Sequence, residues 1–187
     1  MRFDTFLFYW INGRLASPVL DALMPFITEK FNFLGVIIIG AAVILVKGRR
    51  RDIRSLIIIV LAVLLSDYLS EVFKHLSGRI RPCNALAGAR VLVGCTASFS
   101  FPSGHATNVF AAMVFLTMRY RRLAPFFLVF ASAVAYSRVY VGVHYPLDIL
   151  GGAALGTAVA LAFHHAETRL LPPLIKHYGG KRDSVEV

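Results

Sequence analysis

Five long apolar runs divide this 187-residue chain, and they constrain its fold more than any other feature. A helix needs about 20 residues to cross the roughly 30 Å hydrocarbon core of a bilayer. Open sheet edges are excluded from lipid because their backbone groups would lack hydrogen bonds. The runs therefore predict an all-α, polytopic membrane helical bundle with five transmembrane helices. They cover residues 31–46, 56–73, 103–118, 123–143 and 146–163.

The composition supports a membrane protein. Hydrophobic residues make up 57% of the chain and charged residues 16%, whereas an ordinary soluble domain has about 25% charged residues. The mean hydropathy of +0.68 excludes intrinsic disorder and disfavours a water-soluble domain. The chain is nevertheless basic, with 20 Lys and Arg against 10 Asp and Glu. Membrane topology accounts for only part of this excess.

Basic residues mark one side of the predicted bundle. Residues 47–54 contain five cations, residues 119–122 contain three, and four more follow the last run. The positive-inside rule places these connections in the cytoplasm. The N-terminus and residues 74–101 and 139–145 are then expected on the outer side.

The first thirty residues differ from a signal peptide because Asp4 interrupts their apolar stretch. Their aromatic residues predict an interfacial helix, and Ser17 with Pro18 predicts the cap and first turn of a second short helix. A sixth, short span here is the alternative. No repeat or linker divides the chain, so we expect a single domain, 1–187, with interfacial helices in 1–30 and a frayed tail in 179–187.

Cationic and small polar residues gather at the predicted outer ends of several helices. Ionisable groups are costly in membrane segments and mark functional sites. Lys74, Arg81 and Arg138 would repel one another unless they bind a multivalent anion, and guanidinium groups suit phosphate oxygens. Ser103 and Gly104 begin a helix, whose free N–H groups and dipole attract anions. These residues predict a phosphate-binding site.

Two histidines could supply the reactivity of such a site. His144 would be the nucleophile, and Asp148, in the first turn of the next helix, would fix its tautomer. His105 would protonate the leaving group and later deprotonate water. Together with the cations, these residues form a phosphoryl-transfer set that needs no metal and no other cofactor.

The same residues occur in a linked sequence pattern. It reads KxxxxxxRP at 74–82, PSGH at 102–105 and SRxxxxxHxxxD at 137–148. This pattern resembles the three-part signature of the type-2 phosphatidic acid phosphatase superfamily, which includes bacterial acid phosphatases, glucose-6-phosphatase and vanadium haloperoxidases. The resemblance covers roughly residues 20–165. It implies a phosphohistidine on His144, acid/base catalysis by His105, and phosphate binding by Lys74, Arg81, Ser103, Gly104, Arg138 and Ser137.

Neighbouring polar residues are open to more than one interpretation. Asp67 and Glu71 share a helix face with Lys74, and they either orient it or form a polar patch. Arg79 is more simply a solvated loop residue than a ligand for a second phosphate. His164, His165 and His177 are expected at the cytoplasmic interface rather than in a metal site.

The chain has two cysteines, Cys83 and Cys95, and both belong to the predicted outer loop. An oxidising compartment favours a disulfide that closes a loop of thirteen residues. Two reduced thiols are the alternative.

The predicted substrate is a lipid phosphate, with its head group in the cationic site and its tail in the bilayer. Within the resemblance, the N-terminal pattern is similar to bacterial undecaprenyl-diphosphate phosphatases; it consists of Ile11-Asn12, Pro18, Leu20-Asp21 and Phe26-Ile27-Thr28. This likeness favours that substrate and a bacterial inner membrane with an outward-facing site. Lipid A 1-phosphate, phosphatidylglycerophosphate and phosphatidic acid are the alternatives. A transporter or flippase is the alternative outside the enzymes, but its charges would be spread through the membrane. Oxidation of the kind that haloperoxidases catalyse is a more distant enzymatic alternative. No nucleic-acid partner is expected, and the oligomeric state is open.

Overall fold

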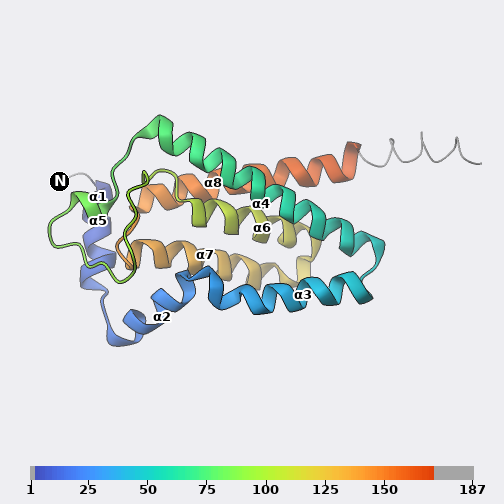
Figure 1. The fold of residues 1–187 in the computed structure, drawn as a ribbon, viewed down its shortest axis with the longest axis horizontal. Helices are drawn as coiled ribbons and strands as arrows, with labels where there is room; N and C mark the ends of the chain where they lie inside the picture. Colours follow the sequence, from blue (N-terminus) through green and yellow to red (C-terminus); the bar gives the residue numbers. More distant parts are fainter. Residues whose placement is uncertain (1–2, 171–187) are drawn as a thin grey trace, which may run out of the picture.

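The computed structural model describes residues 3–170, and every regular element in this range is a helix (Figure 1). The predicted tail, 179–187, and His177 lie outside the described residues. The elements are α1 (Phe3–Tyr9), η1 (Trp10–Arg14), α2 (Pro18–Thr28), η2 (Lys30–Phe33), α3 (Leu34–Lys47), α4 (Arg50–Ser77), α5 (Pro82–Ala85), α6 (Gly104–Arg119), η3 (Arg121–Leu123), α7 (Ala124–Tyr140), α8 (Pro146–His165) and η4 (Ala166–Leu170).

Four of these helical segments are long and apolar enough to cross a membrane: Lys30–Lys47, Arg50–Ala85, Arg121–Tyr140 and Pro146–Arg169. The remaining predicted span corresponds to α6, which has 16 residues. Because α6 packs against α4, α7 and α8, its neighbours shield it on several sides. The predicted all-α, polytopic membrane fold is confirmed.

Helices α6 and α8 pack closely through glycines of α8. A Cβ atom on Gly152 would lie 2.6 Å from the carbonyl oxygen of Ser103, and one on Gly156 would lie 2.2 Å from that of Thr107. Small residues four positions apart are a common way for membrane helices to approach. This close approach sets the start of α6 beside the start of α8, where the motif residues lie.

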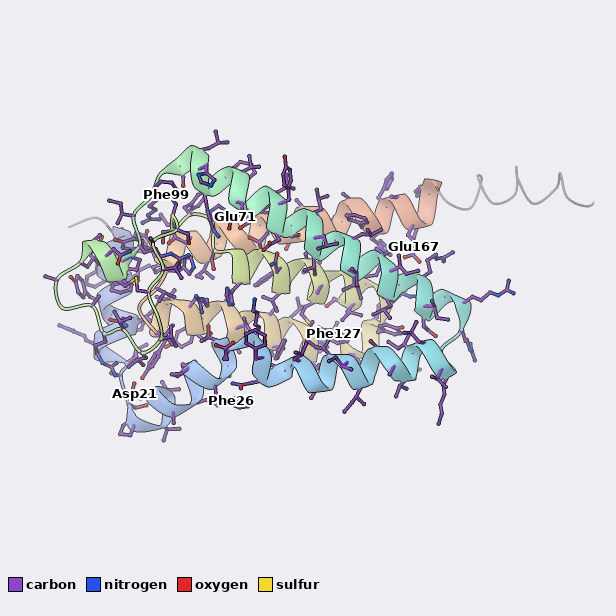
Figure 2. The ribbon with its side chains drawn as sticks, in the orientation of Figure 1. Asp21, Phe26, Glu71, Phe99, Phe127 and Glu167 are labelled. Atoms are coloured by element: carbon purple, nitrogen blue, oxygen red, sulfur yellow. A yellow bond between two sulfur atoms is a disulfide. The ribbon has the colours of Figure 1, made fainter. Side chains whose placement is uncertain are left out.

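The basic connections 47–54 and 119–122 lie with the end of α8 at one end of the bundle, to the right in Figure 1, in agreement with their predicted grouping. The cations at 176, 181 and 182 lie outside the described residues. We call this end of the bundle the basic end. It is held by an ion pair between Arg54 and Glu167 at 2.9 Å and by a hydrogen bond from Tyr120 to Asp52 at 2.8 Å. Figure 2 shows Glu167 at this end and Glu71 toward the other. That other end, the loop end, carries α1, α2, α5 and residues 86–103.

The N-terminal segment packs against the loop end of the bundle. Phe8 is buried against Val139 and Tyr145, whereas Phe3 is 73% exposed. The buried amide of Asn12 donates to the carbonyl oxygen of Tyr140 at 2.7 Å. The segment is thus hydrogen-bonded to α7. It also carries exposed aromatic residues, as expected of an interfacial helix.

Helix α2 begins as predicted. Ser17 is its N-cap and accepts a hydrogen bond from the backbone N–H of Leu20 at 3.3 Å, and Pro18 is its first residue. With 11 residues, α2 has about half the length that a membrane-spanning helix needs.

Candidate active site

One cavity of about 530 Å³ joins residues from all three sequence motifs. Its lining contains cations and histidines contributed by α4, α6, α7 and the segments between helices. The six motif residues in this lining are Lys74, Arg81, Gly104, His105, Arg138 and His144.

Lys74 lies near the end of α4 and is buried. Its ammonium group donates to the carboxylate of Glu71 at 2.5 Å. Asp67 also lines the cavity, but it accepts a hydrogen bond from Asn108 of α6 at 2.9 Å. Of the two carboxylates on this face of α4, Glu71 is therefore the one that contacts Lys74.

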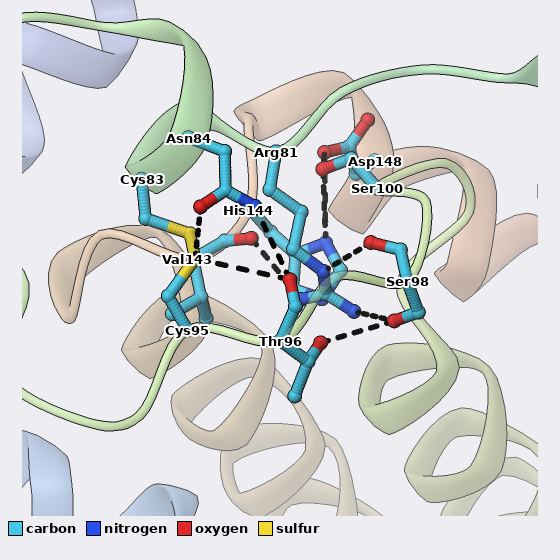
Figure 3. The surroundings of a disulfide bond; sticks show 10 residues. All are labelled: Arg81, Cys83, Asn84, Cys95, Thr96, Ser98, Ser100, Val143, His144 and Asp148. Carbon is cyan, nitrogen blue, oxygen red and sulfur yellow. Dashed lines mark hydrogen bonds and ion pairs between the residues drawn. A yellow bond between two sulfur atoms is a disulfide. The ribbon is translucent and has the colours of Figure 1, made fainter.

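Arg81 precedes α5 and has hydrogen bonds on every side of its guanidinium group. It donates to the carbonyl oxygen of Ser98 at 2.8 Å and to its hydroxyl at 2.9 Å. Its Nη1 lies 3.0 Å from Nε2 of His144. A disulfide between Cys83 and Cys95 joins α5 to the loop that contains Ser98 (Figure 3). This bond links the two segments that fix Arg81.

Arg138, in the last turn of α7, is 9% exposed. Its Nη1 donates to the hydroxyl of Thr28, at the end of α2, at 2.6 Å. Its Nε is buried and has no hydrogen-bond partner within the described residues. Arg138 therefore has an unused donor beside the cavity. Ser137, by contrast, donates to Val134 in its own helix at 2.7 Å and is absent from the cavity lining.

The start of α6 is shaped by Ser103 and Gly104. Ser103 is the N-cap residue, and its hydroxyl faces the backbone N–H of Ala106 at 3.5 Å. A Cβ atom on Gly104 would come within 3.1 Å of the Ser70 hydroxyl and 3.5 Å of the Lys74 ammonium nitrogen. Glycine therefore keeps space open next to Lys74, and His105 follows it on the cavity wall.

His144 lies in the tight turn between α7 and α8, which Gly142 makes possible with a φ of 88°. Its Nδ1 is 3.5 Å from Oδ2 of Asp148 and 3.4 Å from the Ser100 hydroxyl. Burial lowers the pKa of His144 from its ordinary 6.5 to about 4, although the hydrogen bond to Asp148 opposes this shift. The imidazole is therefore neutral near pH 7, which is the form that can act as a nucleophile.

Asp148 is fully buried, and four groups surround its carboxylate. Oδ2 accepts hydrogen bonds from Ser100 at 2.5 Å and from the backbone N–H of Tyr145 at 2.8 Å, and Oδ1 accepts one from Arg79 at 2.7 Å. Such bonds favour the ionised carboxylate. Asp148 is thus held in one orientation against His144.

The interpretation of Arg79 as a solvated loop residue is wrong. Besides Asp148, its guanidinium group pairs with the buried carboxylate of Asp4, and it stacks on the ring of Tyr145 with its Cζ 4.1 Å from the ring centroid. Asp4 also accepts a hydrogen bond from the backbone N–H of Leu147 at 2.9 Å. Two carboxylates and an aromatic face therefore hold Arg79 in place.

Sequence reasoning missed four residues that support the site: Asp4, Thr28, Ser98 and Ser100. A carboxylate that interrupts an aromatic, apolar stretch is a sequence signal that could have drawn attention to Asp4. The other three are small polar residues without a distinctive pattern, and no sequence signal marks them.

The likeness to known proteins agrees with this geometry. Residues 55–171 match the PAP2 superfamily. An undecaprenyl-diphosphatase of Sulfolobus acidocaldarius is 34% identical over 159 residues, which cover 84% of this chain and 75% of the relative. A lipid A 4'-phosphatase of Bacteroides thetaiotaomicron is 31% identical over 163 residues, covering 82% and 72%.

Two crystal structures share the fold. LpxE of Aquifex aeolicus has a TM-score of 0.72 at 22% identity, over 87% of this chain and 95% of that one. A PAP2-type phosphatidylglycerolphosphate phosphatase of Bacillus subtilis has a TM-score of 0.72 at 26% identity, over 90% and 86%. The bundle, its cationic cavity and these relatives define a membrane lipid phosphatase. The chain belongs to the PAP2 superfamily.

Proposed function

We propose that this phosphatase removes the terminal phosphate of a lipid diphosphate, with undecaprenyl diphosphate as the favoured substrate. The observation that carries this proposal is the two-part lining of the cavity. Cations and histidines from the motifs line one part, and apolar side chains that include Ile37, Val63 and Phe130 line another. An anionic head group with an apolar chain is complementary to such a lining.

The proposed reaction has two steps. In the first, Nε2 of the neutral His144 attacks the terminal phosphorus and an N–P bond forms. The bond to the leaving oxygen breaks while the protonated imidazole of His105 donates its proton to that oxygen. In the second, His105 takes a proton from water, the water oxygen attacks the phosphohistidine, and inorganic phosphate leaves. Arg81, Arg138 and Lys74 would stabilise the charge that develops on the phosphoryl oxygens.

Dephosphorylation of lipid A, phosphatidylglycerophosphate or phosphatidic acid is the second candidate, and the lipid A phosphatases among the relatives favour it. The arrangement of charges does not favour a transporter or flippase, because the cavity cations gather toward the loop end while the basic connections lie at the opposite end.

We place the enzyme in a bacterial inner membrane with the site facing outward. The basic end and the disulfide support this orientation.

The test is phosphate release by the purified protein in detergent, with EDTA present, from undecaprenyl diphosphate, lipid A and phosphatidylglycerophosphate. We expect the highest kcat/KM for undecaprenyl diphosphate, and we expect His144→Ala and His105→Ala to abolish turnover. His165→Ala is the matched control, because this histidine is exposed near the basic end. Full activity in either site variant would contradict the mechanism. A higher kcat/KM for either other lipid would contradict the substrate.

A further inference from the structure

The lining of the cavity includes one cation that belongs to none of the three motifs. We propose that Lys30 binds the phosphate that is not transferred, and so forms a second phosphate subsite that makes the enzyme selective for lipid diphosphates over lipid monophosphates. This inference rests on the proposed phosphatase function of the same cavity. It adds a residue of the N-terminal segment to those that contact substrate.

Lys30 is attached to the cationic cluster through its own chain segment. It is the first residue of η2, two positions after Thr28, whose hydroxyl accepts the 2.6 Å hydrogen bond from Arg138. Thr28 and Lys30 both line the cavity that contains Arg138 and His144. The Thr28–Arg138 hydrogen bond therefore holds the chain segment next to Lys30 against the cationic cluster.

The ammonium group of Lys30 is available for a ligand. It lies 5.4 Å from the ring centroid of Phe31, and no carboxylate of residues 3–170 is within ion-pair distance of it. The adjacent carboxylate of Glu29 instead accepts a hydrogen bond from the backbone N–H of Phe31 at 3.3 Å. By contrast, Arg79, which the sequence analysis considered as a ligand for a second phosphate, is paired with Asp4 and Asp148.

The charge of the lining suits two phosphates better than one. Four cations line the cavity, and one of them, Lys74, is paired with Glu71 at 2.5 Å. The three lining cations without a carboxylate at ion-pair distance within residues 3–170 are Lys30, Arg81 and Arg138. A phosphate monoester carries only about −1.5 to −2 at neutral pH. Arg81 and Arg138 together match that charge, so Lys30 is left to face the second ionised group of a diphosphate.

The position of Lys30 also fits the order of groups along a lipid diphosphate. Its neighbours in sequence, Ile27, Phe33 and Ile37, belong to the apolar lining, whereas His144 belongs to the cationic part. With the terminal phosphate at His144, the phosphate that joins it to the lipid lies toward the apolar part. Lys30 is the cation at this boundary.

The test compares two substrates with the same apolar tail, farnesyl diphosphate and farnesyl monophosphate. Lys30→Met removes the charge and keeps the length of the side chain. The variant loses the charge-assisted hydrogen bond from Lys30 to the second phosphate, which only the diphosphate has. The ratio of kcat/KM for the diphosphate over the monophosphate should therefore fall about 10- to 100-fold. Lys30→Arg keeps the charge and should retain most of this selectivity.

Lys47→Met is the matched control, because it removes a cation from the other end of the same helical unit, at the basic end. It should leave the ratio at the wild-type value. An equal loss with both substrates, or an unchanged ratio in Lys30→Met, would overturn the subsite while leaving the phosphatase function intact. If the wild-type protein releases no phosphate from either substrate, the proposed function fails, and the subsite fails with it.

Discussion

Asp4→Asn tests whether α1 supports catalysis or only stabilises the fold. Asp4 is buried, accepts the hydrogen bond from Leu147 at the start of α8, and pairs with Arg79, which donates to Asp148 at 2.7 Å. Asparagine keeps the shape and one acceptor for Leu147. It removes the negative charge that faces Arg79, so that Asp148 is the only anion left to hold the guanidinium group.

The size of the effect follows from these contacts. A hydrogen bond between charged groups contributes about 1.5–3 kcal/mol, and Arg79 is 29% exposed, which screens part of it. We therefore expect the free energy of unfolding to fall by about 2 kcal/mol, which lowers Tm by about 4–8 °C in a chain of this size. Because Arg79 also orients Asp148, kcat should fall by about tenfold.

The assay is phosphate release and thermal unfolding in the same detergent. Asp52→Asn is the matched control, since Asp52 pairs with Tyr120 and Arg119 at the basic end, far from the cavity. It should lower Tm and leave kcat unchanged. Asp4→Glu, which restores the charge, should recover part of kcat. A wild-type kcat in Asp4→Asn would refute the argument that α1 positions Asp148 through Arg79.

Three further predictions concern packing, pH and the disulfide. Gly156→Ala should lower the free energy of unfolding by about 1–3 kcal/mol, because its Cβ would lie 2.2 Å from the Thr107 carbonyl oxygen. Gly35→Ala is the control and should have little effect on Tm, because its Cβ would meet no atom within 4 Å. Equal Tm changes in the two variants would contradict the packing argument. Since the pKa of His144 is about 4 in the folded protein and ordinarily 6.5, the unfolded chain alone binds a proton between these values. Stability should therefore fall by up to about 3 kcal/mol as the pH falls from 6.5 to 4, and an equal pH dependence of Tm in His144→Ala would exclude this cause. Cys83→Ser removes the disulfide that closes a loop of thirteen residues and should lower the free energy of unfolding by about 3 kcal/mol. The variant should have a lower Tm than the oxidised wild type, and reductant should not change the Tm of the variant. A Tm equal to that of the oxidised wild type would contradict this prediction.

The sequence was sufficient to predict the membrane bundle and its two ends because both depend on local properties. A span is recognised by its apolar length, and the basic residues that group the connections are adjacent in sequence. The prediction was less accurate for the limits of the helices. The run 123–143 contains a helix that ends at Tyr140, because Gly142 turns the chain toward His144. Such a turn leaves the hydropathy of the run unchanged.

The role of Arg79 could not be predicted from the sequence, for a physical reason. Its partners are Asp4, 75 residues away, and Asp148, 69 residues away, and only the packing of α1 against the start of α8 brings them together. Neither helical periodicity nor motif spacing contains this information. The contact between Thr28 and Arg138, 110 residues apart, is of the same kind.

The cations of the site have two types of partner within the protein. Lys74 and Arg79 contact carboxylates, so their charge is compensated within the protein. Arg81 and Arg138, among the described residues, donate hydrogen bonds to carbonyl, hydroxyl and imidazole groups and have no carboxylate in direct contact. A buried charge without a counterion is costly. A phosphate that binds between these two arginines would supply a counterion in direct contact with both, which favours substrate binding.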